Sequence, residues 1–186
     1  EKYGLIGKKA VAVIDYKFDE KYLQTENQAY HNDRVMRKMI SLFERYFGKI
    51  NYLNQYNRQA FIISADNTEE KDIVNTIRTI YNIFIKENKH VHVRIGIGEI
   101  AQGLEGLKKS YDQSRIARKT INKSGVMFYK ELGIYQLLFY IDDTSKIDDY
   151  VKEILDPLLI YDKKNNQNLI DTLREYLKCG QNVSQA

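Results

Sequence analysis

Short apolar runs of strand length alternate, over the first two thirds of the chain, with longer stretches in which apolar residues recur every three or four positions. Runs of the first kind favour β-strands, and the second spacing is typical of amphipathic helices. The pattern predicts strands at 8–16, 49–56, 59–64, 92–99 and 126–129. It predicts helices at 27–47, 69–87 and 104–121, with Gly48 ending the first helix and Thr68 as the N-cap of the second.

The order of these elements predicts the fold class. Strand, helix, two strands, helix and strand, followed by one more helix and strand, is typical of an α+β ferredoxin-like sandwich. In such a fold two helices lie on one face of a mostly antiparallel sheet. The polar pair Asn57-Arg58 is expected to form the turn of the central hairpin.

From residue 132 onward the pattern is wholly helical, with helices predicted at 132–141, 147–155 and 169–177. Pro157 is expected to kink or restart the second helix, and 162–168 is a polar break. Gly180 suits a left-handed cap, and Asn182 suits the N-cap of a further helix. Helix, glycine turn and second helix is how a helix-turn-helix begins, although a single helix packed on the sheet has the same pattern.

Composition limits the classes of protein that fit. The 186 residues are 43% hydrophobic, enough for one good core with a small appendage. The single Cys179 allows no internal disulfide and fits a reducing cytoplasm. Since the sequence has no signal peptide and no long apolar run, we expect a cytoplasmic protein without a membrane anchor. The net charge of +4 is too mild to indicate a nucleic-acid partner by itself.

Asp15, at the end of the first predicted strand, is the main candidate for catalytic chemistry. In sheets of the nucleotidyl-cyclase type, an acid here and another on the central hairpin hold two divalent metals. The hairpin residues Asn57–Ala60 include no carboxylate, so half of the ligands are missing. We therefore expect Asp15 to be a strand-end cap or turn residue, and the chain not to be an enzyme.

The other candidate motifs also have simpler explanations. Gly96, Gly98 and Ala101 match a dinucleotide fingerprint weakly, because the first glycine lies inside the strand; these glycines more simply let a helix or chain approach the sheet. The histidines lack further ligands for a metal, and Cys179 lacks a partner base. We assign no catalytic, cofactor-binding or metal-binding residue. The histidines concerned are His31, His90 and His92.

The third predicted helix is basic along one side. A solvated face is the simplest interpretation, and contact with phosphate or a partner is the alternative. The basic residues are Lys108, Arg115 and Lys119, with Lys109, Arg118 and Lys123 nearby.

Seven short segments, in this order and spacing, resemble the PucR/CdaR family of bacterial transcription regulators. They are Gly96-Ile-Gly98, the stretch from Gly103 to Arg115, Gly133-Ile-Tyr-Gln-Leu-Leu138, Asp156-Pro-Leu-Leu159 with Tyr161-Asp162, and Leu173-Arg-Glu-Tyr-Leu177 with Asn182-Val-Ser184. The resemblance implies a degenerate GGDEF-like (diguanylate cyclase-like) domain at 1–131, a helical connector at 132–165, and the truncated opening of a helix-turn-helix at 166–186. It also makes Asp15 and Phe18 remnants of the cyclase first-strand motif.

The resemblance implies a function and partners. The chain would be a fragment of a regulator whose GGDEF-like domain dimerises or transmits a signal to the DNA-binding module. Its recognition helix would lie beyond Ala186, so no DNA-contacting residue is assigned. Implied partners are DNA through the full-length protein, a second copy of the chain, and a small-molecule effector of unknown identity, with no cofactor. The alternative is a nucleotide-binding or effector-sensing relic of a nucleotide cyclase.

Overall fold

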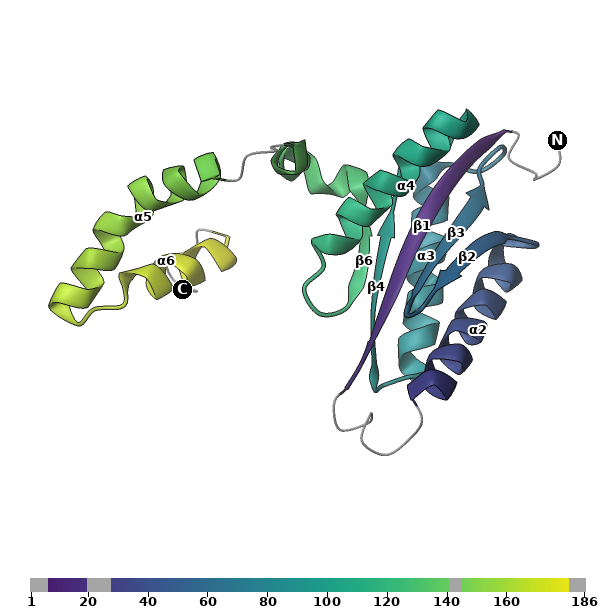
Figure 1. Ribbon diagram of the computed structural model, residues 1–186, viewed down its shortest axis with the longest axis horizontal. Helices are drawn as coiled ribbons and strands as arrows, with labels where there is room; N and C mark the ends of the chain where they lie inside the picture. Colours follow the sequence, from purple (N-terminus) through teal and green to yellow (C-terminus); the bar gives the residue numbers. More distant parts are fainter. Residues whose placement is uncertain (1–6, 20–27, 141–144, 181–186) are drawn as a thin grey trace. The chain divides into compact units, whose positions relative to one another are not determined.

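A computed structural model describes residues 7–19, 28–140 and 145–180, and it confirms the α+β fold with a C-terminal helical extension (Figure 1). The strands form one sheet in the order β2-β3-β1-β4-β6, and β5 also pairs with β1. All pairings are antiparallel except that of β4 with β6. The strands are β1 Lys8–Phe18, β2 Asn51–Gln55, β3 Arg58–Ser64, β4 Val91–Ile97, β5 Ala101–Gln102 and β6 Gly125–Phe128.

The helices follow the predicted order. In the first part of the chain they are α2 Gln28–Phe47, α3 Glu70–Glu87 and α4 Gly103–Lys119. A 3-10 segment η1 (Tyr129–Tyr140) comes next, and then α5 (Ser145–Asn165) and α6 (Leu169–Lys178). The chain divides into two compact units, residues 1–136 and 137–186. The predicted boundaries after residues 131 and 165 remain predictions.

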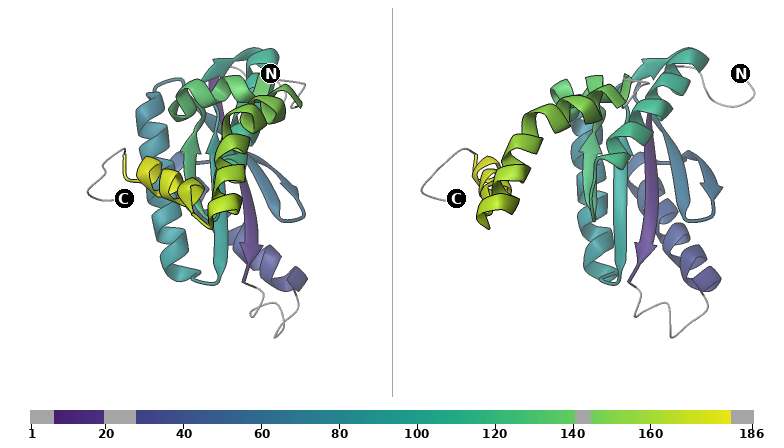
Figure 2. Two further views of the ribbon diagram at one scale, coloured as in Figure 1. Left: turned by 90° about the vertical axis from the view of Figure 1, so that its left-hand side faces the viewer. Right: turned by 60° about the vertical axis from the view of Figure 1, so that its left-hand side comes forward.

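The central strand β1 is buried on both faces, which explains its nearly continuous apolar run. Its side chains alternate between two layers. Even-numbered residues from Ala10 to Phe18 join the main core with α2 and α3, whereas Val11 and Val13 pack with Leu107 and Tyr111 of α4. The sheet therefore carries α4 on the face opposite α2 and α3 (Figures 1 and 2).

Most apolar side chains of α2 and α3 are buried, since the apolar stripes of both helices face the sheet. Tyr46 of α2 is an exception, because 42% of it remains exposed. The ends of these helices agree only in part with the prediction. Gly48 ends α2 as predicted, with a left-handed φ of 74°.

Thr68 is not the N-cap of α3. The N-cap is Glu69, whose side chain makes no capping hydrogen bond. The hairpin turn also lies one residue earlier than predicted, at Tyr56-Asn57, where Tyr56 has a φ of 49°.

Helix α4 sits unusually close to the sheet because two residues of the adjoining strand and loop have no side chain. A methyl group at Gly96 would overlap the Ser114 carbonyl oxygen and come within 2.8 Å of the Arg118 Cβ atom. At Gly98 it would meet the backbone of Ser110, whose Oγ atom accepts a hydrogen bond from the Val11 amide at 3.0 Å. This confirms that the glycines allow close approach of a helix.

The second unit contains α5 and α6. Helix α5 runs without interruption through Pro157, which neither ends nor restarts it, and it extends into the predicted polar break. The Asp162 carboxylate then accepts hydrogen bonds from the amides of Leu169 (2.9 Å) and Ile170 (3.0 Å), capping the start of α6. Gly180 adopts the predicted left-handed conformation after α6. Asn182 lies outside the described residues.

The segment predicted as a regular helix at 132–141 differs from that expectation. Within the described residues it belongs to η1, which is interrupted at Gly133 (φ 53°, ψ −128°). Left-handed or mirror-β backbone of this kind is accessible to glycine at little cost, so the apolar spacing alone could not reveal the break.

The close seat of α4 is testable with alanine. Gly96→Ala should lower the free energy of unfolding by about 3 kcal/mol or more, because the helix or the strand must move to accommodate the methyl group. Chemical denaturation measures the change. The control is Gly48→Ala, where a methyl group meets nothing within 4 Å and only the positive φ matters, at a cost of about 1–2 kcal/mol. Equal losses in the two variants would contradict the tight packing.

Candidate functional site

Asp15 lies within β1 rather than at its end, and it faces α4. It is the register partner of Arg58 on β3 and of Arg94 on β4, so the three side chains share one face of the sheet. Only 6% of Asp15 is exposed. The prediction of a strand-end cap or turn residue is therefore wrong: β1 continues to Phe18 because Tyr16 and Phe18 belong to the main core.

Two arginines bind both carboxylate oxygens of Asp15. Arg94 approaches as a fork, with Nε donating to Oδ1 at 3.2 Å and an Nη donating to Oδ2 at 2.8 Å. Arg118, from α4, donates a second charged hydrogen bond to Oδ2. Because bidentate and charge-assisted pairs are the stronger class of hydrogen bond, the arginines fix this carboxylate firmly.

Arg118 itself is almost completely buried, with 6% of the residue exposed. The prediction that it belongs to a solvated basic face of the helix is wrong, because α4 turns this position toward the sheet above Gly96. The other members of the set remain at the surface. Lys108, Lys109, Lys119 and Lys123 are exposed, and Arg115 is half-buried.

The hairpin corner lies beside Asp15, as a two-metal centre of the cyclase type would require. Tyr16 and Asn57 are joined by two hydrogen bonds of 3.0 Å, one from the Tyr16 amide to the Asn57 carbonyl and one from Asn57 Nδ2 to the Tyr16 carbonyl. The residue opposite Asp15 on this hairpin is Arg58, a cation. Among the residues that the structure describes, no three His, Cys, Asp or Glu side chains are placed to hold a metal ion.

The main core, on the opposite face of β1 from Asp15, contains the hydrogen-bonded side chains of Tyr16 and Gln59. The Tyr16 hydroxyl donates to the side-chain carbonyl of Gln59, whose amide donates to the Met36 carbonyl at 3.2 Å and to Asn54 at 2.9 Å. Burial raises the pKa of Tyr16 well above 10.0, and the Asp15 charge adds to that rise. Tyr16 therefore stays protonated and acts as a hydrogen-bond donor that ties β1 to β3.

The histidines and the cysteine occupy separate places. His92 makes a 2.9 Å hydrogen bond to Asp19, and the His90 ring lies 3.8 Å from the same carboxylate. His90 precedes β4, which begins at Val91, whereas His92 lies within the strand. His31 lies in α2, and Cys179 is the C-cap of α6. Gly96 and Gly98 of the weak dinucleotide fingerprint are explained by the close packing of α4 on the sheet.

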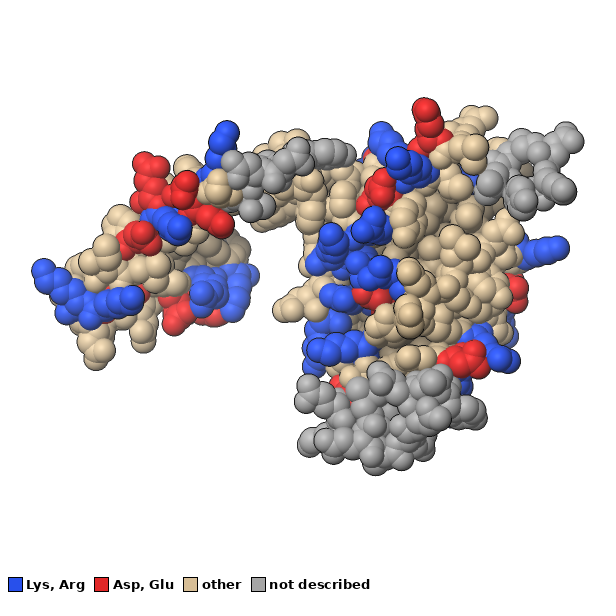
Figure 3. All heavy atoms as spheres, in the orientation of Figure 1, with Lys and Arg blue, Asp and Glu red and all other residues tan. Residues whose placement is uncertain are grey.

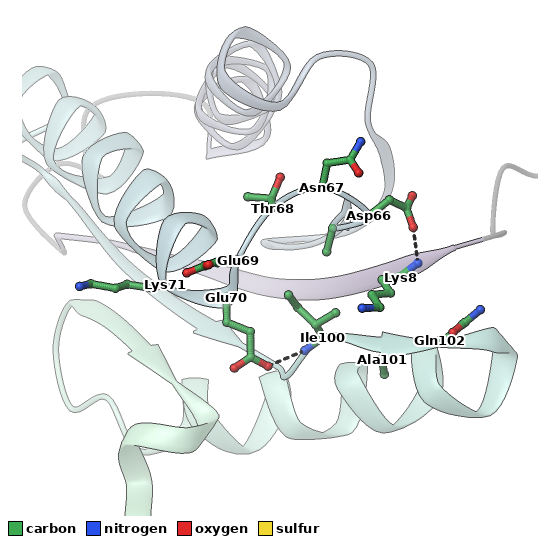
Figure 4. Close-up of a pocket in the computed structure, with 11 residues that line it drawn as sticks. Lys8, Asp66, Asn67, Thr68, Glu69, Glu70, Lys71, Ile100, Ala101 and Gln102 are labelled. Carbon is green, nitrogen blue, oxygen red and sulfur yellow. Dashed lines mark hydrogen bonds between the residues drawn. The ribbon is translucent and has the colours of Figure 1, made fainter.

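A second candidate site is a hollow of about 860 Å³ at the other end of β1, between the start of α3 and the β4–β5 connection (Figure 4). The Asp66 carboxylate accepts hydrogen bonds from the Lys8 amide at 2.6 Å and from Ser64 Oγ at 3.0 Å, which hold the Asp66 pKa below its ordinary 3.8. Glu70 accepts from the Ile100 amide at 3.2 Å and pairs with Lys130 at 2.8 Å. Both acids are thus occupied by protein partners.

A sheet of this order, with helices on both faces and an acid on the central strand beside a hairpin, defines the cyclase-like class of α+β domains. The family model of the GGDEF-like domain matches residues 3–120. The match covers more than half of the chain, and the chain belongs to the GGDEF-like domain family.

Comparisons with individual proteins agree with this class. The chain is 23% identical over 171 residues to the DNA-binding transcriptional activator AdeR of Bacillus subtilis (strain 168), a match that covers 82% of this chain and 40% of AdeR. The chain thus spans about two fifths of that relative's length. The active GGEEF domain of a diguanylate cyclase from Vibrio cholerae has a TM-score of 0.50 and 16% identity, covering 66% of this chain and 83% of the domain.

A dimeric guanylyl cyclase domain of the RhoGC fusion protein from Blastocladiella emersonii is also similar, with a TM-score of 0.48 and 7% identity over 66% of this chain and 79% of that one. The Vibrio cholerae domain shares the fold of this chain. No helix among the described residues is both long and apolar enough to cross a membrane.

Sequence reasoning identified Asp15 and the hairpin but missed the arginines that hold this acid. One signal was present, since Arg94 is a charged residue inside a buried strand, and such a residue needs a partner. Arg118 follows Ser110, Ser114 and Ala117, the small buried residues of α4. That spacing marks the face toward the sheet rather than toward solvent.

The ion pair can be tested by removing the buried arginine. Arg118→Met should lower the free energy of unfolding by about 3 kcal/mol, because Asp15 stays buried with one cation fewer. Arg78→Met is the matched control: Arg78 pairs with Glu131 at 2.5 Å, and 44% of its side chain is exposed. Its loss should cost about 0–1 kcal/mol. Comparable denaturation midpoints for the two variants would refute the structural importance of the buried pair.

Proposed function

We propose that this chain is the non-catalytic GGDEF-like part of a bacterial transcription regulator of the PucR/CdaR type. The main support for this proposal is that arginines already bind the Asp15 carboxylate. A divalent cation would need this carboxylate, yet both oxygens are bound by Arg94 and Arg118. The position facing it on the hairpin is Arg58, which adds positive charge where a metal would need a second acid.

A metal ion would have to compete with the arginines for Asp15. Freeing Asp15 for a metal would leave the buried Arg118 guanidinium without its counterion. The cost would be on the order of several kcal/mol, as for any buried ion pair that loses one partner. The incoming cation would also be repelled by three nearby guanidinium groups. Phosphoryl transfer by a two-metal mechanism needs ligands that this arrangement supplies only in part. We infer that the domain has a mechanical or binding role.

The absence of cyclase activity can be measured directly. The purified chain, incubated with GTP or ATP and Mg²⁺, should form no cyclic nucleotide and no cyclic dinucleotide above the level of a heat-denatured sample. Chromatography with mass detection quantifies the products. Wild-type turnover that disappears in Asp15→Asn would overturn the non-catalytic role, provided that circular dichroism shows the variant to be folded.

DNA is the proposed macromolecular partner, through residues that follow Ala186 in the full-length protein. AdeR is by name a DNA-binding activator, and this supports the same class for a protein containing this chain. On α6, Leu169, Leu173 and Leu177 recur every four residues and are at least 37% exposed. An amphipathic helix normally buries such a stripe. We propose that the next helix of a helix-turn-helix covers it.

A homodimer follows from the same proposal, because two-fold operators require two recognition helices at a fixed spacing. The apolar side chains of α5 offer a contact surface for assembly. None of the described side chains of α5 is buried, and several large ones are more than 40% exposed: Tyr150, Val151, Ile154, Leu159, Ile160 and Tyr161. The proposed setting is the cytoplasm, where regulators reach DNA.

A second candidate function is the sensing of a small-molecule effector by this domain. The hollow beside α3 favours it, since its volume of about 860 Å³ lies in the range of small-molecule sites. In that case a metabolite, rather than an upstream domain, would bias the regulator.

DNA binding should depend on the chain beyond Ala186. In fluorescence anisotropy with fragments upstream of the gene, the 186-residue chain should bind weakly or not at all, while the full gene product should bind tightly. Leu173→Asp in the full product should abolish tight binding by disturbing the stripe on α6, and Glu175→Gln, at an exposed position, should not. A full product that fails to bind DNA, or that ends at Ala186, would refute the proposal.

A further inference from the structure

The face of the sheet below α4 is basic beyond what Asp15 can neutralise. Arg94 and Arg118 bind this single carboxylate from β4 and α4, and Arg58 lies opposite Asp15 on β3. Lys17 lies on the same face of β1, two residues along from Asp15, and is exposed. Figure 3 shows Lys and Arg side chains gathered over this part of the molecule with few acids among them.

Two guanidinium groups of this cluster have a donor that the described protein atoms leave unused. The Nε atoms of Arg58 and Arg118 are buried and have no hydrogen-bond partner within the described part of the chain. Arg118 is more than nine-tenths buried. An unsatisfied buried donor is costly, and in native proteins such groups are usually met by water or by a bound ligand.

Solvent can still reach the cluster from one side. Arg94 has 35% of its side chain exposed, compared with 7% for Arg118. Arg58 is half-buried and has no ion-pair partner among the described residues. Asp19, an acid that directly follows β1, is already hydrogen-bonded to His92. A ligand would therefore approach from the Arg58 and Arg94 side without displacing a protein carboxylate.

We propose that Arg58, Arg94, Arg118 and Lys17, which together form the arginine cluster, bind the phosphate group of a small molecule. Planar guanidinium forks bind tetrahedral oxyanions through paired hydrogen bonds. A phosphate dianion matches the charge that the three arginines leave after the Asp15 carboxylate is subtracted, and Lys17 adds one further positive charge. Asp15 then has a positioning role: it holds Arg94 and Arg118 in place while their remaining donors, with those of Arg58, face the ligand.

Arg58→Gln separates this proposal from a purely structural ion pair. Because Arg58 pairs with no described acid, the variant should fold with a melting temperature close to that of the wild type in phosphate-free buffer. Inorganic phosphate or pyrophosphate at millimolar concentration and constant ionic strength should raise the melting temperature of the wild type in a saturable manner. In Arg58→Gln the apparent Kd should rise by about tenfold or more, as expected for one lost charged hydrogen bond.

The matched control is Arg37→Gln, which removes the same charge from an α2 arginine whose side chain is 78% exposed. It should bind phosphate as the wild type does. This comparison is needed because phosphate at high concentration stabilises many proteins through exclusion from their surface, without saturation and independently of a single arginine.

A second readout observes the unused donors themselves. In ¹H–¹⁵N spectra, the Nε–H signals assigned to Arg58 and Arg118 should shift on addition of phosphate, and that of Arg37 should not. Equal, unsaturable stabilisation of all three proteins would overturn the proposal. So would stronger binding of malonate than of phosphate, or Nε–H shifts produced by a DNA duplex and not by phosphate or pyrophosphate.

Discussion

The seat of α4 on the sheet is the constraint on which the site depends. Gly96 and Gly98 leave room for the helix backbone, and only at that distance can Arg118 reach Asp15 on the central strand. A larger residue at position 96 would lift the helix and with it the second cation. Packing thus decides the chemistry of this face, since the absence of a methyl group at position 96 determines whether Asp15 is held by two arginines or by Arg94 alone.

A buried pair of this kind is a poor source of stability in itself. Desolvation of Asp15 and Arg118 offsets much of their attraction, and an apolar pair of similar size often serves a core as well or better. The sheet also needs no charge at this position for cohesion, because the main core on the other face holds the large aliphatic and aromatic residues. Retaining one carboxylate under three arginines is easier to understand as the support of a binding surface than as the stabilisation of a fold.

The sequence predicted the fold well because the fold depends on periodic burial. The stripes of α2 and α3 and the continuous run of β1 each have one packing solution, and Gly96 and Gly98 indicated close contact. The site is harder to predict from sequence. The polar Asp15 and the following Lys17 interrupt the apolar run and so predict a strand end, whereas the even-numbered Tyr16 and Phe18 carry β1 onward. Helical spacing predicts that Arg118 is exposed to solvent, because spacing alone does not show how closely a helix packs on a sheet.

The helix ends show the same limit of sequence patterns. Thr68 has the right chemistry for a cap, yet the N-cap of α3 is Glu69, and Pro157 is compatible with an uninterrupted α5. In both places a local preference of about 1–3 kcal/mol is outweighed by the surrounding structure.

The arginine cluster is connected by direct contact to the segment that follows the sheet. Ala117, next to Arg118 on α4, packs against Tyr129 and Leu132 at the beginning of η1. A shift of α4 on the sheet would therefore also change its contacts with η1, the segment in which Gly133 interrupts the helical backbone. Contact alone does not make a signal, because a ligand shifts an equilibrium only by its difference in affinity for two states. The requirement on any effector of this domain is thus specific: it must bind more tightly to one position of α4 than to another.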